Sequence, residues 1–418
     1  MKSSIALAVG VLASLGIAVF YGAPVFGQSS TAPKYKFDGG WPKPLPNKWK
    51  IGGVTGLAVD KDDNVWVYDR PNDLTDIELE AELTPPVADC CVRPPSMIHI
   101  DKNGNVLGSF DAPQGHGMAV DSKGFAYLGQ DTVRKYDTRT GKLAGTVPRT
   151  AEHVPGQAGD FNPQTFTENH QPGRGSVGPV YNFLRVPGRP APDPSAMAER
   201  AAAVKAFREK YPPTTPMIVG GIEEIRLDEP AREMYVADNY LGGRVMVFDM
   251  DTLQFKRGWG AYGHKLNQIT TDDKDRAYTP GGPEPKEFRG HLTLNISNDG
   301  KLYAADRMAN RIQVFRRDGT YLNQEFVVAP MTGVGGSTGG VMFSPDKAQK
   351  TLYISDLTNN HVWFLDREDG KVIGQLGSMG ENGGQFFGLH MIATDSKGNL
   401  YTGEVFAGQR VQRFLLTK

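Results

Sequence analysis

An internal repeat that occurs six times constrains the fold of this chain more than any other feature. Each copy has a short apolar strand, a turn rich in Asp, Asn or Gly, a second strand with an aromatic residue, a polar bend and a third strand. Strands this short cannot bury a core alone, so the copies must pack against one another. The pattern predicts an all-β fold, a six-bladed β-propeller. The second strands are expected at residues 65–69, 126–128, 234–238, 302–306, 352–356 and 400–404.

Segments outside the repeat complete or interrupt the ring. The sixth copy ends near the C-terminus, so we expect a strand from residues 33–53 to complete the last blade. Residues 71–95 form a loop with Pro and acidic residues inside the first blade. Residues 148–217 form a long insertion between blades two and three, with a helix over residues 194–211 that Ser195 can cap. An insertion of this length is either a lid over one face or a peripheral decoration.

The first residues predict the compartment. Residues 1–27 have a basic start, an apolar run and then small residues, which is the pattern of a secretory signal peptide. The apolar run also approaches spanning length, so an uncleaved anchor is the alternative. We expect a secreted or periplasmic protein without stable membrane association after cleavage, with residues 33–418 forming the propeller. The only cysteines, Cys90 and Cys91, are adjacent and either form a vicinal disulfide or remain thiols.

Composition limits the kinds of partner. The chain has 418 residues, a net charge of −1 and 39% hydrophobic residues, so it is long enough for a large core. Near-neutral charge gives no reason to expect binding to nucleic acid or to an anionic membrane. We expect a monomer that acts on a small molecule or a peptide.

Three histidines stand just before or at the first strand of alternate copies: His116, His291 and His390. When the insertion is left out, the two spacings between them are nearly equal. The first strands of a propeller surround its axis, so the three imidazoles are expected to converge there. Three neutral imidazoles with an open fourth position are typical of a catalytic zinc site. The alternative is that each histidine fills the channel and binds backbone atoms.

Three further candidates, Arg70, Tyr240 and Arg307, follow the ends of second strands, which lie on the same face as the starts of first strands. Arginine can hold a carboxylate through two hydrogen bonds. A tyrosine beside a cation loses its proton more easily and can act as a base. Structural alternatives remain open: Arg70 could pair with Asp69 or Asp73, Tyr240 could pack in its loop, and Arg307 could take a repeat-related role.

The pattern of Asp followed by Arg-Val/Ile-x-x-Phe resembles the NHL repeat. The segments around the candidate residues resemble the peptidyl-α-hydroxyglycine α-amidating lyase family, over about residues 50–416 apart from the insertion. Members of this family are six-bladed propellers with a catalytic zinc bound by three histidines. They split a peptide that ends in α-hydroxyglycine into a peptide amide and glyoxylate. The matching segments are residues 68–73, 115–117, 237–240, 290–292, 305–307 and 389–391.

The resemblance implies a role for each candidate. His116, His291 and His390 would bind zinc, and Tyr240 would take the proton of the carbinol oxygen. Arg70 and Arg307 would then orient the substrate and stabilise developing negative charge.

The chain departs from the family at several positions. Met391 stands where the family has a carboxylate that helps to bind calcium, so calcium is a second expectation whose site lacks one ligand. Gly388 replaces a family methionine, and Leu241 follows Tyr240 without a partner cysteine to pin the loop. These departures leave the substrate open.

Two other functions are compatible with the sequence. One is a non-catalytic NHL-repeat propeller that binds a protein or a small ligand. The other is a lactonase-like propeller hydrolase, a class that ligates calcium through Glu, Asp and Asn. Glu223 or Asn295 near the axis would favour that class. We expect an exported, zinc-dependent carbon–nitrogen lyase.

Overall fold

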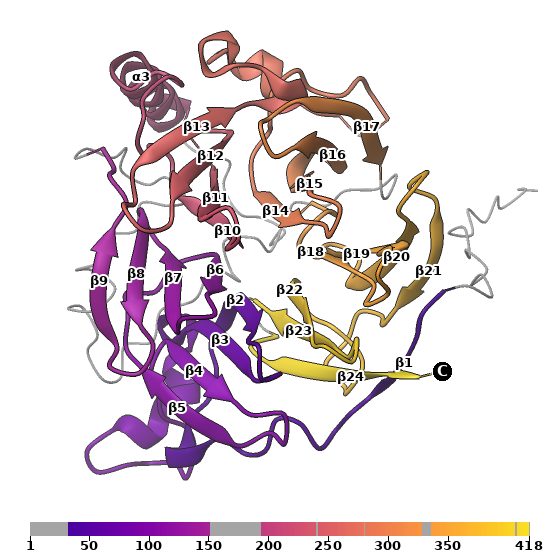
Figure 1. The fold of residues 1–418 in the computed structure, drawn as a ribbon. Helices are drawn as coiled ribbons and strands as arrows, with labels where there is room; N and C mark the ends of the chain where they lie inside the picture. The colour runs from indigo at the N-terminus through magenta and orange to yellow at the C-terminus, as the bar shows by residue number, and fades with distance from the viewer. Residues whose placement is uncertain are drawn as a thin grey trace, which may run out of the picture.

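Six four-stranded antiparallel sheets surround one axis in the computed structural model (Figure 1). The six-bladed propeller expected from the repeat is therefore confirmed. The expected signal peptide and residues 151–193 of the insertion lie outside the described residues. The structure describes residues 32–150, 194–239, 241–279, 281–327, 336–405 and 408–417.

Each of the first three blades is a meander of four consecutive strands, with the innermost strand first. Blade one has β2 (Gly53–Val59), β3 (Val65–Arg70), β4 (Met97–Ile100) and β5 (Val106–Phe110). Blade two has β6 (Met118–Val120), β7 (Phe125–Gly129), β8 (Val133–Asp137) and β9 (Lys142–Thr146). Blade three has β10 (Ile222–Asp228), β11 (Glu233–Asp238), β12 (Arg244–Asp249) and β13 (Phe255–Trp259).

The next two blades repeat this meander, and the sixth takes its outer strand from the start of the described chain. Blade four has β14 (Leu292–Ile296), β15 (Lys301–Asp306), β16 (Arg311–Arg316) and β17 (Tyr321–Val327). Blade five has β18 (Val341–Phe343), β19 (Thr351–Asp356), β20 (His361–Asp366) and β21 (Val372–Leu376). Blade six has β22 (Leu389–Thr394), β23 (Leu400–Glu404), β24 (Val411–Thr417) and β1 (Lys34–Phe37).

The N-terminal strand closes the ring. β1 pairs antiparallel with β24, and it lies within the range expected to complete the last blade. Next to it, Arg413 Nε donates to Asp38 Oδ2 at 2.9 Å. The Arg413 guanidinium also lies 5.6 Å from the centre of the Trp41 ring, a cation–π distance. Residues from both ends of the described chain thus share one sheet.

The core lies between neighbouring blades. Fully buried tyrosines from the second strands pack against the adjacent sheet: Tyr235 of blade three contacts blade four, and Tyr303 of blade four contacts blade five. Tyr353 continues this pattern toward blade six, and Tyr401 packs on blade one. Each sheet therefore buries its apolar face only when its neighbour is present.

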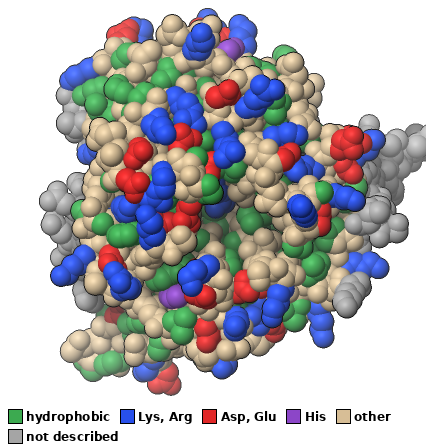
Figure 2. All heavy atoms as spheres, in the orientation of Figure 1, with side chains coloured by type: hydrophobic (Ala, Val, Ile, Leu, Met, Phe, Trp, Pro, Cys, Tyr) green, Lys and Arg blue, Asp and Glu red, His purple; other side chains and the backbone are tan. Residues whose placement is uncertain are grey.

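The two faces of the ring carry different connections. Short turns such as residues 60–64 and 395–399 join first to second strands on one face. The other face carries the long connections 71–96, 147–221 and 260–291, and we call it the long-loop face. First strands begin and second strands end there. Figure 2 shows that the ring surface is hollowed at its centre, with basic and acidic side chains around the hollow.

Helix α3 (Pro194–Lys210) of the insertion lies beside blade three, at the outer side of the ring in Figure 1. Phe207 packs with Leu241 of the β11–β12 connection, and Arg208 Nη1 binds Asp273 Oδ1 at 2.8 Å. The helix expected over residues 194–211 is therefore present. The choice between a lid and a peripheral decoration depends on residues outside the described ones. Of the helices in the described residues, none has the length and apolar character to cross a membrane.

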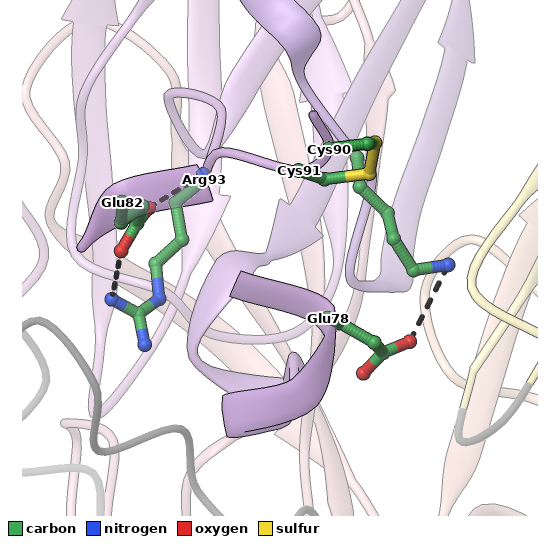
Figure 3. Close-up of a disulfide and its surroundings, with 6 residues drawn as sticks. Glu78, Glu82, Cys90, Cys91 and Arg93 are labelled. Atoms are coloured by element: carbon green, nitrogen blue, oxygen red, sulfur yellow. Dashed lines mark hydrogen bonds and ion pairs between the residues drawn. A yellow bond between two sulfur atoms is a disulfide. The ribbon is translucent and has the colours of Figure 1, made fainter. Parts of the chain in front are cut away.

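Cys90 and Cys91 form a vicinal disulfide in the 71–96 connection (Figure 3). Beside it, Arg93 Nη1 binds Glu82 Oε2 at 2.8 Å, and the Cys91 backbone N–H donates to the Glu78 carbonyl at 3.2 Å. Of the two alternatives for these cysteines, the structure has the disulfide.

A buried carboxylate ends the second strand of most blades. In blade four, Arg311 Nη2 binds Asp306 Oδ2 at 3.2 Å, and neither side chain is exposed to solvent. The same carboxylate accepts the backbone N–H groups of Arg289 and Gly290, at 3.0 and 3.3 Å, where the chain enters β14. It thereby fixes the end of the second strand against the start of the first. Asp238 with Arg244 repeats this pairing in blade three, and Glu404 with Arg410 in blade six.

Removing the arginine of this pair is expected to destabilise the propeller. Arg311→Met leaves the Asp306 carboxylate buried without its cation, which typically costs about 3–5 kcal/mol. Urea unfolding followed by circular dichroism measures this loss. The control, Arg316→Met, changes an exposed residue of the same strand and should alter stability by less than about 0.5 kcal/mol. Equal stability of the two variants would contradict the structural role of the pair.

Candidate metal centre

His116 reaches the axis from the residue before the glycine that leads into β6, and it is buried. Its Nδ1 lies 2.7 Å from the backbone carbonyl of Glu223. Since a carbonyl only accepts, Nδ1 carries the proton and Nε2 presents its lone pair. Gly117 makes this contact possible, because a Cβ there would lie 2.9 Å from the same carbonyl oxygen. A second hydrogen bond of this kind is how proteins orient metal-binding histidines.

His390 projects from a bulge in β22. The register of β22 on β23 shifts between Leu389 and Met391, so His390 is the extra residue. Its carbonyl accepts from Ser355 Oγ at 2.6 Å and from the Gly340 N–H at 3.2 Å. Its Nε2 lies 3.1 Å from His116 Nε2. The ring nitrogens of two distant blades therefore point at one place.

Glu223 supplies a carboxylate to the same place. It lies in a register shift of β10 between Ile222 and Ile225 and is fully buried. Its Oε1 is 3.5 Å from His116 Nε2 and 3.9 Å from His390 Nε2. The side-chain N–H of Asn239 lies 3.5 Å from the other carboxylate oxygen. From the sequence, Glu223 is expected near the axis only in the lactonase-like alternative, and Asn239 is not among the predicted site residues.

His291 lies beside this group rather than within it. It takes a left-handed backbone conformation with φ 56° and precedes Leu292, the residue paired with Asp306. Its Nδ1 is 3.3 Å from Glu223 Oε1. In the described part of the chain, the compact group, with ligand atoms all within 4.8 Å of one another, is His116, Glu223 and His390.

Among the described residues, the compact group that could hold a metal thus joins Glu223 to two of the three expected histidines, and His291 approaches the same Glu223 oxygen. The repeat predicts equivalent positions for the three histidines, but the strand registers of His291 and His390 differ. His291 comes one residue before Leu292, which pairs with Asp306 at the end of the second strand. His390 comes one residue after Leu389, which pairs with Glu404 at the same place in blade six. Glu223 follows the corresponding residue of blade three, which puts it at the same level as His390.

Arg307 points into the centre from the start of η7 (Arg307–Ala309). Its Nη1 donates to His390 Nε2 at 2.8 Å, and its Nη2 donates to His291 Nδ1 at 2.6 Å. Nη1 also lies 3.6 Å from Glu223 Oε1. The repeat's own structural arginine position is filled by Arg311, so Arg307 does not take that role.

Arg70 and Asn295 have partners of their own. Arg70 Nη2 binds Asp73 Oδ2 at 2.9 Å, which matches one of the pairings left open by the sequence. Asn295 donates to the Val341 carbonyl at 2.7 Å and so ties two first strands together. Tyr240 lies outside the described residues, directly after the buried Asn239.

Burial controls the protonation of the group. It lowers the pKa of His116 from 6.5 to about 4, with the positive charges of Arg70 and Arg307 adding to the effect. Burial, His116 and Arg307 also hold the pKa of His390 well below its ordinary value. Burial opposes ionisation of Glu223, but the pKa of its carboxyl lies well below the usual range, and the permanent charge of Arg307 contributes to this. Two neutral imidazoles and one carboxylate are the forms that bind metals.

Comparison with known proteins adds similarity of fold. No protein-family model and no curated protein matches the chain. It is similar to a structural genomics protein of unknown function from Bacteroides thetaiotaomicron, with a TM-score of 0.49, 14% identity and coverage of 91% of this chain and 73% of that one. It is also similar to virginiamycin B lyase from Staphylococcus aureus, with a TM-score of 0.43, 11% identity and coverage of 92% and 90%. A catalytically inactive variant of that lyase with quinupristin gives a TM-score of 0.43, 10% identity and coverage of 92% and 100%. We draw no functional conclusion from similarity at this level.

The buried histidines are expected to make stability depend on pH. The pKa of His116 is about 4 in the folded chain, and its ordinary value is 6.5. Between pH 4 and 6.5, His116 therefore binds a proton in the unfolded chain but not in the folded chain. Stability of the metal-free protein should fall as pH decreases from 6.5 to 4, by roughly 3 kcal/mol for His116 alone. Urea unfolding at successive pH values measures this fall. A slope in His116→Gln as steep as that of the unmodified protein would contradict the assignment.

Proposed function

We propose that this protein is a zinc-dependent enzyme of the lyase class, with the metal held by His116, His390 and Glu223 on the propeller axis. One observation supports the metal above all others. His116 Nε2, His390 Nε2 and Glu223 Oε1 lie 3.1, 3.5 and 3.9 Å from one another. Three buried ligand atoms this close together can all bind one divalent cation.

The ligand types suit zinc. Two neutral imidazoles and one carboxylate, with a position left open, are a known catalytic zinc set. The Glu223 carbonyl orients His116, and Asn239 approaches the carboxylate oxygen that faces away from the histidines. His291 remains a candidate for a further ligand, because it approaches the same Glu223 oxygen. Bound zinc would supply a Lewis acid that polarises a substrate oxygen.

The arginines favour an anionic substrate. Arg307 brings a permanent positive charge to the centre, and Arg70 is close enough to lower the pKa of both ligand histidines. The Nε atoms of both arginines are buried without a hydrogen-bond partner among the described residues, so each can donate further. A carboxylate beside the reacting carbon meets this need.

A carbinolamide with an adjacent carboxylate fits these groups and the sequence resemblance. In the proposed reaction, Tyr240 takes the proton from the carbinol oxygen, and that oxygen becomes the carbonyl of glyoxylate. The carbon–nitrogen bond breaks, and its electrons stay on nitrogen, which takes up a proton to give the amide. Arg70 and Arg307 hold the carboxylate and offset the developing negative charge. We further propose that the protein works as an exported monomer.

A lactonase-like hydrolase is the second candidate, because Glu223 does lie at the axis. The ligand set argues against it, since calcium prefers oxygen ligands and two of the three ligand atoms are imidazole nitrogens. Asn295, the other residue that would favour this class, donates its side-chain N–H to a backbone carbonyl.

Zinc content is the direct test of the metal. The purified protein is expected to hold one zinc per chain, measured by atomic emission spectrometry after dialysis. His116→Ala, His390→Ala and Glu223→Gln should each weaken binding at least about 100-fold, because each removes one of only three ligands. His361→Ala, which changes a residue of β20 outside this group, is the control. Folded protein that takes up no zinc would overturn the proposal, and loss of zinc in His291→Ala but not in Glu223→Gln would restore the three-histidine set.

Glyoxylate release tests the reaction. A zinc-loaded protein is expected to release glyoxylate from a peptide that ends in α-hydroxyglycine, measured by its hydrazone absorbance. Tyr240→Phe should lose about 100-fold or more of kcat while keeping its zinc, because loss of a general base typically costs 10²–10⁴-fold. Tyr321→Phe, on the outer strand β17, is the control. Unchanged turnover in Tyr240→Phe would remove Tyr240 from this role, and no turnover by zinc-loaded protein would overturn the substrate class.

A further inference from the structure

We propose that Arg307 determines access to the metal site, because its guanidinium occupies the same imidazole nitrogens that a metal ion needs. This inference rests on the proposed function, in which the centre binds zinc. It concerns the hydrogen bonds of Arg307 to imidazole nitrogens of the centre.

The argument begins with the two hydrogen bonds of Arg307. Nη1 donates to His390 Nε2 at 2.8 Å, and Nη2 donates to His291 Nδ1 at 2.6 Å. Each of these nitrogens must be unprotonated to accept, and an unprotonated imidazole nitrogen has one lone pair. That lone pair either accepts from Arg307 or binds a metal. Zinc binding at His390 therefore requires the hydrogen bond from Arg307 to break.

Charge leads to the same conclusion. The guanidinium is always protonated in proteins, and Nη1 lies 3.6 Å from Glu223 Oε1. The positive charge of Arg307 thus offsets that of the Glu223 carboxylate in the structure described. A divalent cation among the same three atoms would repel a guanidinium at this distance. The centre can hold Arg307 in its present position or the metal, but not both.

Arg311, four residues later, shows what a permanently bound arginine looks like in this fold. Besides Asp306, its guanidinium donates to Tyr262 Oη at 2.7 Å and to the carbonyls of Pro285 and Glu287 at 2.8 and 3.0 Å. Arg307 has no comparable set of oxygen acceptors, and its Nε is buried without a partner among the described residues. Displacing Arg307 therefore costs two bonds to imidazole nitrogens and its 3.6 Å ion pair with Glu223, whose charge a bound cation would offset. Displacing Arg311 would break the buried Asp306 pair with no cation to replace it.

The displaced guanidinium has an evident use. Once its two hydrogen bonds to the imidazoles are broken, Arg307 can donate the same pair of bonds to a carboxylate, which it binds more strongly than a neutral ring. Metal binding would then prepare the centre for an anionic substrate.

The test measures zinc affinity rather than activity. Zinc dissociation constants are determined by competition with a chromogenic chelator for the unmodified protein and for Arg307→Leu, Arg307→Lys and Arg70→Leu. Removing a competing hydrogen bond to a charged group should tighten zinc binding roughly ten- to hundred-fold in Arg307→Leu. Arg307→Lys keeps the positive charge but lacks the two parallel N–H donors of a guanidinium. Its zinc affinity should therefore lie between those of the unmodified protein and Arg307→Leu. Arg70→Leu removes a charge from the same centre without removing a bond to an imidazole, and it serves as the matched control.

The outcomes separate this inference from the proposed function. A gain in Arg307→Leu that exceeds the gain in Arg70→Leu at least ten-fold supports competition. If the unmodified protein binds zinc and Arg307→Leu binds it no more tightly than Arg70→Leu does, the inference is overturned and the metal site stands. If neither the unmodified protein nor the folded Arg307 variants bind zinc, the proposed function itself fails. Circular dichroism and thermal unfolding confirm that each variant is folded.

Discussion

The buried carboxylate at the end of the second strand is the interaction on which both the fold and the centre depend. In blade four, Asp306 holds Arg311 at the start of the third strand and the Gly290 backbone N–H at the entry to the first. The residue after the carboxylate is Arg307, and the residue after the glycine is His291. One buried ion pair thus positions two side chains of the centre. The same arrangement in blade three puts Asn239 directly after Asp238 and beside Glu223. Burying these carboxylates without partners would cost free energy, so the arginines and backbone N–H groups are needed to stabilise them.

Local breaks in strand register create the geometry of the candidate metal centre. A regular antiparallel pair sends alternate residues to opposite faces of the sheet, and it offers few side chains to a central axis. The register shifts at Glu223 and His390 turn one residue of each inner strand toward the axis. Glycines on the neighbouring blades make room for these shifted residues or bind their backbone. Gly117 leaves room for the Glu223 backbone, and Gly340 donates its N–H to the carbonyl of His390. The centre is therefore built by contacts between blades rather than within one blade.

This origin explains what the sequence could and could not predict. The six-bladed ring followed from the repeat, because the strands of each copy can be recognised from the alternation of apolar and polar residues over a few positions. The convergence of His116 and His390 followed from their place in alternate copies. The place of Glu223 beside these two histidines did not follow, because a one-residue shift of register depends on packing against the next blade. Nothing in the residues around Glu223 marks that shift. Asn239 was not predicted either, because the family resemblance rests on its neighbour Tyr240.

The position of Arg307 links the charge of the centre to its chemistry. A buried carboxylate beside two neutral imidazoles needs a positive partner at all times, since an uncompensated charge at this depth is costly. Arg307 provides that partner in the structure described, at 3.6 Å from Glu223. A divalent metal would take over this task with a larger charge and direct bonds, and it would leave the guanidinium in need of a new anion. An anionic substrate supplies one. The need of Glu223 for a positive partner would therefore favour metal first and substrate second, and it would discourage a bare anion from entering before the metal has displaced Arg307.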